Sequence, residues 1–402
     1  MDLAGGRAVK ALALNAGSSS LKGALYDVEP GAALAAPADV VWQGQVGWDP
    51  GSGGAAAREM LRSVPLESPS ELGVVGHRIV HGGARFHEPV ALGDEVKAAV
   101  RSMTASAPLH NTAGLEGVAV TEELFGDGVP QVAVFDTAFH ADLAPAAHAY
   151  AGPHEWLARG LRRFGFHGIN HEYAAHRAAH LLGRPLDELR LITCHLGSGC
   201  SLAAVRGGRS VDTTMGFTPL EGVVMGTRSG SLDPGLILHL LREEGASVDE
   251  LDTVLNHRSG LRGLSGRSGD LRDVLAARDE GDERAALAFD VYVHRLRFHI
   301  GAMLGSLGGL DAIVFTAGVG EHSAEVREAA LKPFAFLGLQ LDEARNAQAQ
   351  ADCDVAAPGS AVRVLVTRAR EEWAIARAAA EVVGGRRRHH EPEVRRLTHA
   401  RT

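Results

Sequence analysis

The stretch Leu191-Ile-Thr-Cys-His-Leu-Gly-Ser-Gly-Cys-Ser-Leu-Ala-Ala-Val205 decides the fold of this chain. A β-rich apolar run enters a turn at Gly197-Ser198-Gly199, and a second alternating run leaves it. Gly207 and Gly208 permit a further reversal, so the segment predicts consecutive hairpins. Glycines around a serine let the backbone approach a ligand closely, and backbone N–H groups with serine hydroxyls can surround an anion such as phosphate.

A similar arrangement occurs near the N-terminus, at residues 11–27. There we expect strands at residues 9–14 and 24–28, joined by a phosphate-type turn over residues 15–22, which contain Asn15, a run of three serines and Lys22. Either turn alone is most simply an ordinary hairpin. Together, two similar units about half a chain apart predict a duplicated α/β domain that binds a polyphosphate between its copies.

Length and composition indicate a globular chain of two or three domains. Of its 402 residues, 45% are hydrophobic and 22% are charged. No apolar run approaches the ~18 residues of a membrane span, and the first residues lack a signal-peptide pattern. We therefore expect a cytoplasmic protein with no membrane partner.

Charge and cysteine usage exclude further classes. A net charge of −9 and an aromatic content of 5% argue against nucleic acid as a partner. Three cysteines without C-x-x-C spacing argue against a disulfide scaffold and a zinc site. Residues 385–402 are rich in arginine, and we interpret them as a basic, disordered tail.

Two arginines are candidates for binding anions. Arg78 lies in an apolar run, residues 74–80, where a guanidinium is costly to bury unless an anion or carboxylate meets it. The alternative is an edge-strand arginine that faces water. Arg228 lies in a glycine-rich loop over residues 215–235, and loops this long in compact domains are usually functional.

Asp136 and His167 are further candidates. Asp136 ends a predicted parallel strand, residues 131–136, and ligands bind beyond the carboxyl ends of such strands. It is therefore placed to hold a metal, although a carboxylate that caps the next turn is the alternative. His167 precedes a helix predicted at residues 171–182 and is either a ligand-binding or a structural histidine.

The remaining pattern completes an α/β order. A buried strand from residue 311 opens through Gly318 and Gly320 into a helix that begins near Ser323. Backbone without side chains at that turn leaves a slot for a flat ring such as adenine, although tight strand–helix turns need glycine anyway. The other elements that we expect are a strand at 362–367 and helices at 113–125, 274–304 and 371–383.

Eight motifs together resemble the acetate kinase family. They are Asn15-Ala-Gly-Ser-Ser-Ser-Leu-Lys22, His77-Arg-Ile-Val-His-Gly-Gly83, Pro108-Leu-His-Asn111, Phe135-Asp-Thr-Ala-Phe-His140, Phe166-His-Gly168, Gly216-Phe-Thr-Pro-Leu-Glu-Gly222, Gly226-Thr-Arg-Ser-Gly230 and the turn from Gly318 to Glu321. Each is modest alone, but all eight occur in the family's order, from about Leu12 to Val383.

This resemblance implies a duplicated actin-like (ribonuclease H-like) α/β fold with an interdomain cleft. Domain I would comprise residues 1–140 and 372–384, and domain II residues 141–371. The implied activity is reversible, Mg²⁺-dependent phosphoryl transfer from ATP to acetate, giving acetyl phosphate and ADP. Mn²⁺ would be an alternative ion, and a homodimer is implied as well.

The resemblance also assigns residues. The implied catalytic residues are Arg78, Asp136, His167 and Arg228. The implied substrate-binding residues are Arg78, Val80, Leu109, Phe166 and Pro219. The implied metal-binding residues are Asn15 and Glu371. The implied ATP-binding residues are Asn15, Ser18, Ser20, Lys22, His195, Leu196, Gly197, Ser198, Gly199, Asp270, Leu271, Arg272, Gly318, Val319, Gly320 and Glu321.

Four departures from the family pattern keep alternatives open. The family usually has Asn where this chain has Ser198 and Asp where it has Ser231. It usually has Gly-Gly-Ile-Gly-Glu-Asn in place of Ala317-Gly-Val-Gly-Glu-His322, and Thr-Asn or Thr-Asp in place of Ala369-Arg370. The alternatives are a propionate or butyrate kinase, a catalytically weakened family member, and a nucleotide-operated conformational protein of the actin or chaperone type. The pair of arginines beside an apolar pocket disfavours the last of these, because such an ATPase does not need it.

Overall fold

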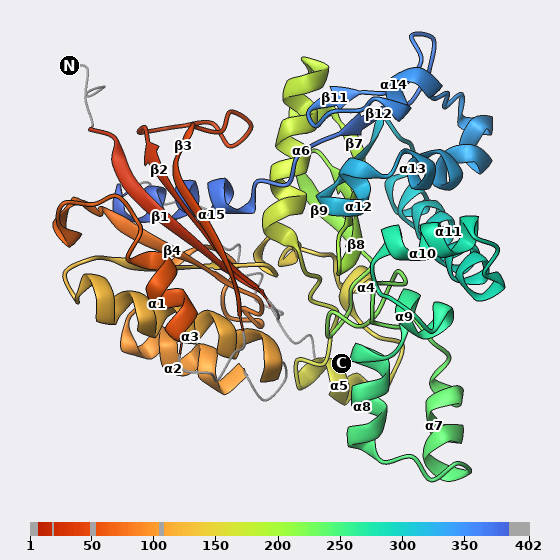
Figure 1. The fold of residues 1–402 in the computed structure, drawn as a ribbon, viewed down its shortest axis with the longest axis horizontal. Coiled ribbons are helices and arrows are strands. Elements are labelled where there is room, and N and C mark those ends of the chain that lie inside the picture. The colour runs from red at the N-terminus through yellow and green to blue at the C-terminus, as the bar shows by residue number, and fades with distance from the viewer. Residues whose placement is uncertain (1–6, 18–19, 49–53, 104–107, 386–402) are drawn as a thin grey trace, which may run out of the picture.

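Two six-stranded sheets form the framework of the computed structural model (Figure 1). The structure describes residues 7–17, 20–48, 54–103 and 108–385, without the side chains of residues 108–110. The first sheet contains β1 (Val9–Ala16), β2 (Ser20–Val28), β3 (Val40–Gly47), β4 (Val74–Ile79), β5 (Val90–Ala91) and β6 (Gln131–Phe135). The second contains β7 (Arg190–Leu196), β8 (Cys200–Arg206), β9 (Arg209–Thr213), β10 (Ala312–Thr316), β11 (Cys353–Asp354) and β12 (Arg363–Val366).

Helices connect and cover these strands. Around the first sheet they are α1 (Ala55–Leu61), α2 (Asp94–Ser102), α3 (Pro108–Phe125) and α15 (Glu371–Val383). The others are α4 (Pro145–His148), α5 (His154–Ala158), α6 (Gly168–Leu182), α7 (Pro234–Arg242), α8 (Val248–His257), α9 (Gly260–Ser265), α10 (Leu271–Asp279), α11 (Glu283–Leu307), α12 (Ala317–His322), α13 (Ala324–Leu331) and α14 (Glu343–Ala347). Short 3₁₀ helices occur at Pro69–Glu71, Ala138–His140, Leu186–Glu188 and Lys332–Leu337.

The two sheets have the same topology, so the predicted duplication is confirmed. The first runs β3-β2-β1-β4-β6-β5, and the second, read in the same sense, runs β9-β8-β7-β10-β12-β11. The antiparallel hairpin β1–β2 corresponds to β7–β8, and the parallel pairs β1–β4 and β4–β6 correspond to β7–β10 and β10–β12. In both halves a short antiparallel strand closes the edge.

Alternation of side chains along the strands places a core on each face of each sheet. In β1, Leu12 and Leu14 pack in one apolar cluster with residues of α1 and α3, while Ala11 and Ala13 pack with α15. In β7, Ile192 faces a cluster that includes α11, and Leu191 faces α6. Both faces of each sheet are therefore buried, which is the arrangement that parallel strands require.

Helices α6 and α15 lie between the sheets. α15 packs on β1, β2, β4 and β6, and it also contacts α6, which packs on β7 and β10. Figure 1 shows α15, coloured blue, among the red strands of the N-terminal half. Both helices present mainly alanines to their sheets, such as Ala376 and Ala175, and small side chains permit close approach. The predicted domain limits stay a prediction.

Several predicted boundaries are wrong. The first turn is shorter than residues 15–22, because Asn15 pairs with Lys22 and Ala16 with Leu21 across the hairpin. α3 begins at Pro108 instead of residue 113, since proline is well tolerated in the first turn of a helix. The single helix predicted at 274–304 is two helices, α10 and α11, separated at Gly281, whose φ is 94°.

Two helices begin earlier than the sequence pattern predicts. α6 begins at Gly168 instead of residue 171, and Gly183 ends it in a left-handed conformation, as expected. After β10 the chain is already helical at Ala317, and a second helix follows Ser323. None of the helices in the described part of the chain is long and apolar enough to cross a bilayer.

Trp373 of α15 contacts the loop before β3, and we expect this contact to stabilise the fold. Trp373 is 0% exposed, and its Nε1 donates to the Leu34 carbonyl at 2.9 Å. Trp373→Phe leaves that carbonyl without its donor and creates a void, so we expect a loss of about 1–3 kcal/mol, seen as a lower urea midpoint. Trp156→Phe is the control, because Trp156 is 45% exposed. Equal midpoints for the two variants would contradict the role given to Trp373.

Candidate active site

The two glycine turns lie at the carboxyl ends of the central strands β1 and β7. In the first, the Gly17 N–H donates to the Ser20 carbonyl at 2.9 Å, and in the second, the Gly197 N–H donates to the Gly199 carbonyl at 3.0 Å. A Cβ atom on Gly199 would lie 3.3 Å from the His167 ring and 3.4 Å from Arg228 Nη1. A larger residue at this position would therefore intrude on both groups. Ser18 lies outside the described residues.

Arg78 and Asp136 form an ion pair at the ends of β4 and β6. Arg78 donates from Nε at 2.8 Å and from Nη2 at 2.5 Å to the same oxygen, Asp136 Oδ2. Their side chains are 13% and 1% exposed. Burial raises the pKa of Asp136 above its usual value, and the guanidinium opposes that shift. Burial acts to lower the pKa of Arg78, but the charges of Asp136 and Glu371 outweigh it. We treat both groups as ionised because the contact is short and doubly hydrogen-bonded.

A second set of carboxylates joins this pair through Asn15. Asn15 Nδ2 donates to Glu371 Oε2 at 2.6 Å and to Glu372 Oε1 at 3.0 Å, while its Oδ1 lies 3.4 Å from Arg78 Nη1. Burial acts to raise the pKa of Glu371, but Arg78, His195 and Asn15 lower it below its usual value. Burial and the neighbouring Glu371 raise the pKa of Glu372. Of the two carboxylates at the start of α15, Glu371 therefore favours the ionised form more strongly.

His167 and His195 lie face to face beside the second turn. Their ring centroids are 4.0 Å apart and the rings are nearly parallel, at 14°. Burial, together with the positive charges of Arg78 and Arg228, holds the pKa of His167 well below its usual value. Burial lowers the pKa of His195 to about 4. Both imidazoles are therefore neutral near pH 7, and each can donate one N–H without carrying charge.

Arg228 lacks a carboxylate partner among the described residues. Its Nη1 donates to the Pro219 carbonyl at 3.3 Å and lies 3.7 Å from the sulfur of Met225. Burial and repulsion from Arg78 lower its pKa. A guanidinium that is held in place but not neutralised is available to bind an anion.

The residues predicted for the acyl group include three that the structure buries. Val80 and Phe166 are 5% and 1% exposed and belong to one apolar cluster. Pro219 is buried, and its carbonyl holds Arg228. The side chain of Leu109 lies outside the described part.

Two of the residues predicted to bind the nucleotide, Asp270 and Arg272, make side-chain hydrogen bonds with each other. Asp270 caps α10 and accepts three hydrogen bonds from the guanidinium of Arg272, whose side chain is 89% exposed. Leu271 is buried beside them. Asp270 and Arg272 therefore pair with each other near the surface, and the adjacent Gly269 contacts Gly226.

The glycine turn after β10 supports the predicted slot in part. A Cβ atom on Gly318 would meet nothing within 4 Å, whereas one on Gly320 would lie 3.4 Å from the backbone of Phe315. Ala317 lies 3.7 Å from the corresponding position on Gly197, which brings this turn next to the second phosphate-type turn. Val319 is partly buried, and Glu321 Oε1 accepts the N–H of Ala369 at 2.8 Å, which ties the turn to the segment before α15.

Sequence reasoning missed four residues of this site. Glu372 shares Asn15 with Glu371, Asn170 contacts His195, and Ser201 and His171 contact His167 and each other. The hairpin register contained a usable signal for one of them, because a turn at residues 197–199 places Ser201 opposite His195. For the others, no spacing along the chain indicated the contact.

Some side chains of this site could bind a divalent ion. No cluster of three or more His, Cys, Asp or Glu side chains suited to a metal occurs in the described residues. Asp136 Oδ1, however, is buried without a hydrogen-bond partner, and Glu371 is ionised nearby. Mg²⁺ typically uses one or two carboxylates, with water and substrate phosphates completing its shell. The residues present fit such an ion.

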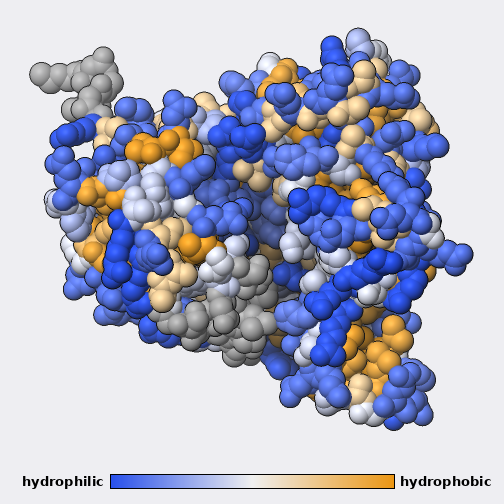
Figure 2. Space-filling model, viewed as in Figure 1, coloured by the Kyte–Doolittle hydropathy of each residue, from blue (hydrophilic) through white to orange (hydrophobic). Residues whose placement is uncertain are grey.

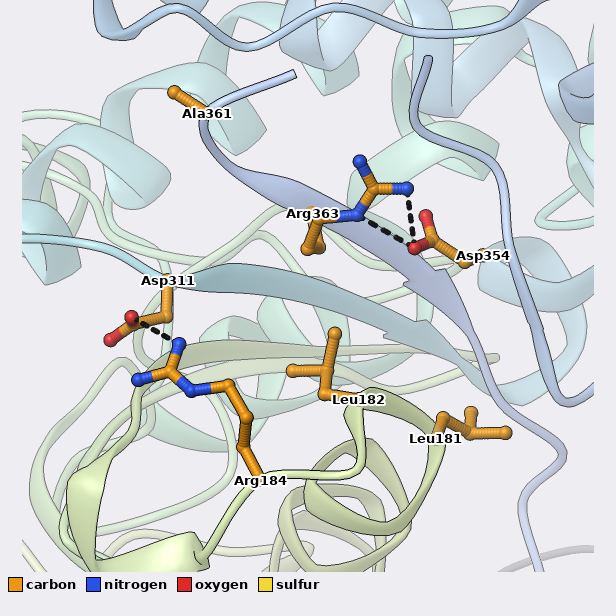
Figure 3. Close-up of a pocket in the computed structure, with 7 residues that line it drawn as sticks. All are labelled: Leu181, Leu182, Arg184, Asp311, Asp354, Ala361 and Arg363. Atoms are coloured by element: carbon orange, nitrogen blue, oxygen red, sulfur yellow. Dashed lines mark hydrogen bonds and ion pairs between the residues drawn. The ribbon is translucent and has the colours of Figure 1, made fainter. Parts of the chain in front are cut away.

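A surface cavity of about 400 Å³ lies elsewhere, at the amino ends of β10 and β12 (Figure 3). Its lining comprises Leu181, Leu182, Arg184, Asp311, Asp354, Ala361 and Arg363. Figure 3 shows that its arginines already pair with its aspartates, Arg184 with Asp311 and Arg363 with Asp354. The candidate site lies at the opposite, carboxyl ends of the strands. Figure 2 shows a hollow between the two halves of the molecule.

The molecule contains two copies of one sheet topology, and each copy presents a glycine turn to the same cluster of arginines, carboxylates and neutral histidines. These features are typical of a two-domain kinase. The chain belongs to the acetokinase family, whose model matches residues 54–377. Curated relatives include an acetate kinase of Gloeobacter violaceus, 51% identical over 92% of this chain and 98% of that relative. The acetate kinase of Gloeothece citriformis is 50% identical, with the same coverage.

Solved structures agree with this assignment. A crystal structure of Porphyromonas gingivalis acetate kinase has a TM-score of 0.83 and 36% identity, covering 94% of this chain and 100% of that one. A propionate kinase from Francisella tularensis has a TM-score of 0.82 and 34% identity, covering 93% and 100%. The family and the predicted fold class are thereby confirmed.

The buried histidines predict how stability depends on pH. Burial lowers the pKa of His77, His81, His140 and His195 to about 4. The unfolded chain binds protons at these groups below about pH 6.5, which the folded chain cannot do, so stability falls as the pH decreases through that value. The raised pKa values of Asp136 and Glu372 act in the opposite direction but are fewer.

We therefore expect the melting temperature to fall from about pH 7 to about pH 5. His140→Gln makes the dependence shallower, because one buried imidazole is removed. His239→Gln leaves it unchanged, because His239 lies at the surface with a side chain 56% exposed. A flat profile for the unmodified protein would show that these histidines are not held neutral.

Proposed function

We propose that this chain catalyses reversible transfer of the γ-phosphoryl group of ATP to acetate, giving acetyl phosphate and ADP. The observation that carries the proposal is that Arg78, Arg228 and neutral His167 lie close together. They lie beside an apolar cluster that contains Val80 and Phe166. Family membership and the names of the relatives support the same chemistry.

The reaction requires no general base. A simple carboxylic acid has a pKa near that of Glu, about 4.3, so acetate is already ionised at neutral pH. The obstacle is repulsion between two anions, acetate and the terminal phosphate. Arg228 has no carboxylate of its own among the described residues, and Arg78 lies close enough to lower the pKa of Arg228. These two guanidiniums offset the repulsion and orient the oxygens, while His167 donates an N–H to the phosphoryl group.

A divalent ion, Mg²⁺ or Mn²⁺, is part of the proposal. Asn15, Asp136 and Glu371 would hold it, with Asp136 Oδ1 as the oxygen that lacks another partner. When bound, such an ion neutralises charge on the β- and γ-phosphates. Within the chain, Asn15 connects the ion pair of Arg78 to the first turn of α15.

For ATP we propose the two glycine turns as the phosphate contacts and the α12 turn as the adenosine contact. Lys22, which is exposed, lowers the pKa values of Glu371 and His195 and therefore lies near them. Gly318 faces open space, as a slot for the base requires. We keep Asp270 and Arg272 as proposed nucleotide residues at the outer edge of this site.

A homodimer and a cytoplasmic location complete the proposal. Helix α7 and the short segment before it expose Leu232, Leu236 and Leu238 by 44%, 43% and 47%, and Figure 2 shows a hydrophobic area over that helix. Such an area is typical of an interaction surface. The three cysteines are free thiols, which suits a reducing compartment.

A propionate kinase is the second candidate, because one solved relative carries that name. Trapping of the acyl phosphate with hydroxylamine, in the presence of ATP, Mg²⁺ and one carboxylate at a time, tests both. We expect the largest kcat/KM with acetate. A larger value with propionate favours the second candidate, and no product with any carboxylate contradicts the proposed activity.

Arg228→Ala is expected to lower kcat by roughly 10³-fold or more, because a charge clamp acts mainly in the transition state. Arg228→Lys should recover only part of that loss, since an ammonium cannot bind two oxygens in one plane. Arg242→Ala, on the exposed surface of α7, is the control. Near-normal kcat for Arg228→Ala would remove Arg228 from the mechanism.

Val80→Ala is expected to enlarge the acyl pocket and raise the activity on propionate and butyrate relative to acetate. The change is limited to ~1–3 kcal/mol per methylene. Val274→Ala truncates another valine of the same apolar cluster, on α10, and serves as the matched control. Identical ratios of kcat/KM in the two variants would show that Val80 does not border the acyl group.

A further inference from the structure

A continuous run of hydrogen bonds leads from the interior of the second sheet to the candidate site. Thr193 Oγ1 lies 2.7 Å from His171 Nδ1, His171 Nε2 lies 2.7 Å from Ser201 Oγ, and Ser201 Oγ lies 2.8 Å from His167 Nδ1. The first three residues are 0% exposed. We call Thr193, His171, Ser201 and His167 the histidine relay. It joins β7, α6 and β8 and ends at the His167 ring.

The relay has only two consistent proton orders. Each hydroxyl has one proton to donate, and each neutral imidazole carries one N–H and one bare nitrogen. If all donors point toward the site, His167 accepts at Nδ1 and carries its proton on Nε2. If all donors point inward, His167 donates from Nδ1 and Nε2 is bare. A charged imidazole in the middle would break either order, and burial lowers the pKa values of both His167 and His171.

The inner end of the relay decides between these orders. In the inward order the Thr193 proton must go to the Ala203 carbonyl, which lies 3.5 Å away. In the outward order it goes to His171 Nδ1 at 2.7 Å. A contact of 3.5 Å is at the limit of a hydrogen bond, whereas 2.7 Å is the usual length for a hydroxyl donor. Both orders use the three short contacts of the relay, but only the outward order leaves no hydroxyl proton on the 3.5 Å contact.

The proton of His195 is also held on Nε2, but by a different hydrogen-bond partner. Asn170 Nδ2 donates to His195 Nδ1 at 2.7 Å, which leaves the proton of the neutral ring on Nε2. His195 Nε2 lies 3.6 Å from the Cβ position on Gly197, and His167 Nε2 lies 3.3 Å from that on Gly199. Two stacked, neutral rings thus direct N–H donors at the same glycine turn.

We propose that Ser201 and His171 are positioning residues that keep the proton of His167 on Nε2, where it faces the transferring phosphoryl group. This inference rests on the proposed function for the identity of the group that accepts the hydrogen bond. His167 keeps its proton throughout, so the relay orients a donor and transfers nothing. With Nε2 bare, a lone pair would instead oppose the phosphoryl oxygens, and the donor would be lost.

The test is the tautomer of His167 in the full-length protein, read by ¹⁵N NMR of histidine-labelled samples. The His167 signals are assigned by their loss in His167→Gln. We expect the unmodified protein to show the Nε2–H form, and Ser201→Ala to shift His167 toward the Nδ1–H form. The kcat of Ser201→Ala should fall roughly 10- to 100-fold, as for other supporting hydrogen bonds in active sites, and its KM for acetate should be nearly unchanged.

Ser210→Ala is the matched control. Ser210 is also buried and its hydroxyl lies 2.7 Å from a histidine, His140 Nδ1, outside the relay. It should lose similar stability but keep the His167 tautomer and kcat. Thr193→Val, nearly isosteric, tests the inner end, because it removes the donor that sets the order and should give a mixture of His167 tautomers.

Retention of the Nε2–H form in both Ser201→Ala and Thr193→Val, or an equal loss of kcat in Ser210→Ala, would overturn the proposal. The tautomer reading does not depend on turnover. If the unmodified protein makes no acyl phosphate, the proposed function fails while the NMR result still decides whether the relay orders His167.

Discussion

The ion pair of Arg78 and Asp136 is the interaction on which the candidate site depends. Burial of two charges costs several kcal/mol per ion unless the pair is close and hydrogen-bonded. The parallel neighbours β4 and β6 meet that condition, since each delivers one partner at its carboxyl end. One carboxylate oxygen is fully used and the other is left without a partner. Through Asn15 the same pair reaches Glu371, so the polar cluster is tied to the sheet and to α15.

Positive charge in the site is concentrated in two guanidiniums, and the nearby imidazoles are neutral. Burial and the charges of Arg78 and Arg228 disfavour a proton on His167. Two imidazolium ions added to two arginines would destabilise the site before any anion was bound. Neutral rings still supply N–H donors, which is why their tautomers matter more than their titration. The arginines therefore attract the anionic substrates, and the neutral histidines orient hydrogen-bond donors toward them.

The sequence predicted the parts of this arrangement that are local. Alternation around Gly197–Gly199 predicted the β7–β8 hairpin, and its echo near Asn15 predicted the duplication. Arg78 in an apolar strand indicated an anionic partner, and the partner in the structure is Asp136. The limits of α3, α10 and α11 were wrong, because a proline near a helix start and a glycine near a break have several possible positions along a chain. Asp270 and Arg272 matched a family motif, and their nucleotide role stays a prediction; in the structure they pair with each other.

By itself, the sequence determined the strand–turn–strand units, their repetition and the residue types available at each strand end. Turn chemistry and alternation act over a few residues, so a linear pattern contains them. Only the tertiary structure decided that Glu372 would share Asn15 with Glu371, more than 350 residues away, and that Ser201 would lie between His167 and His171. Those contacts depend on how two sheets pack through α6 and α15, and packing of separate elements leaves no periodic signal along the chain.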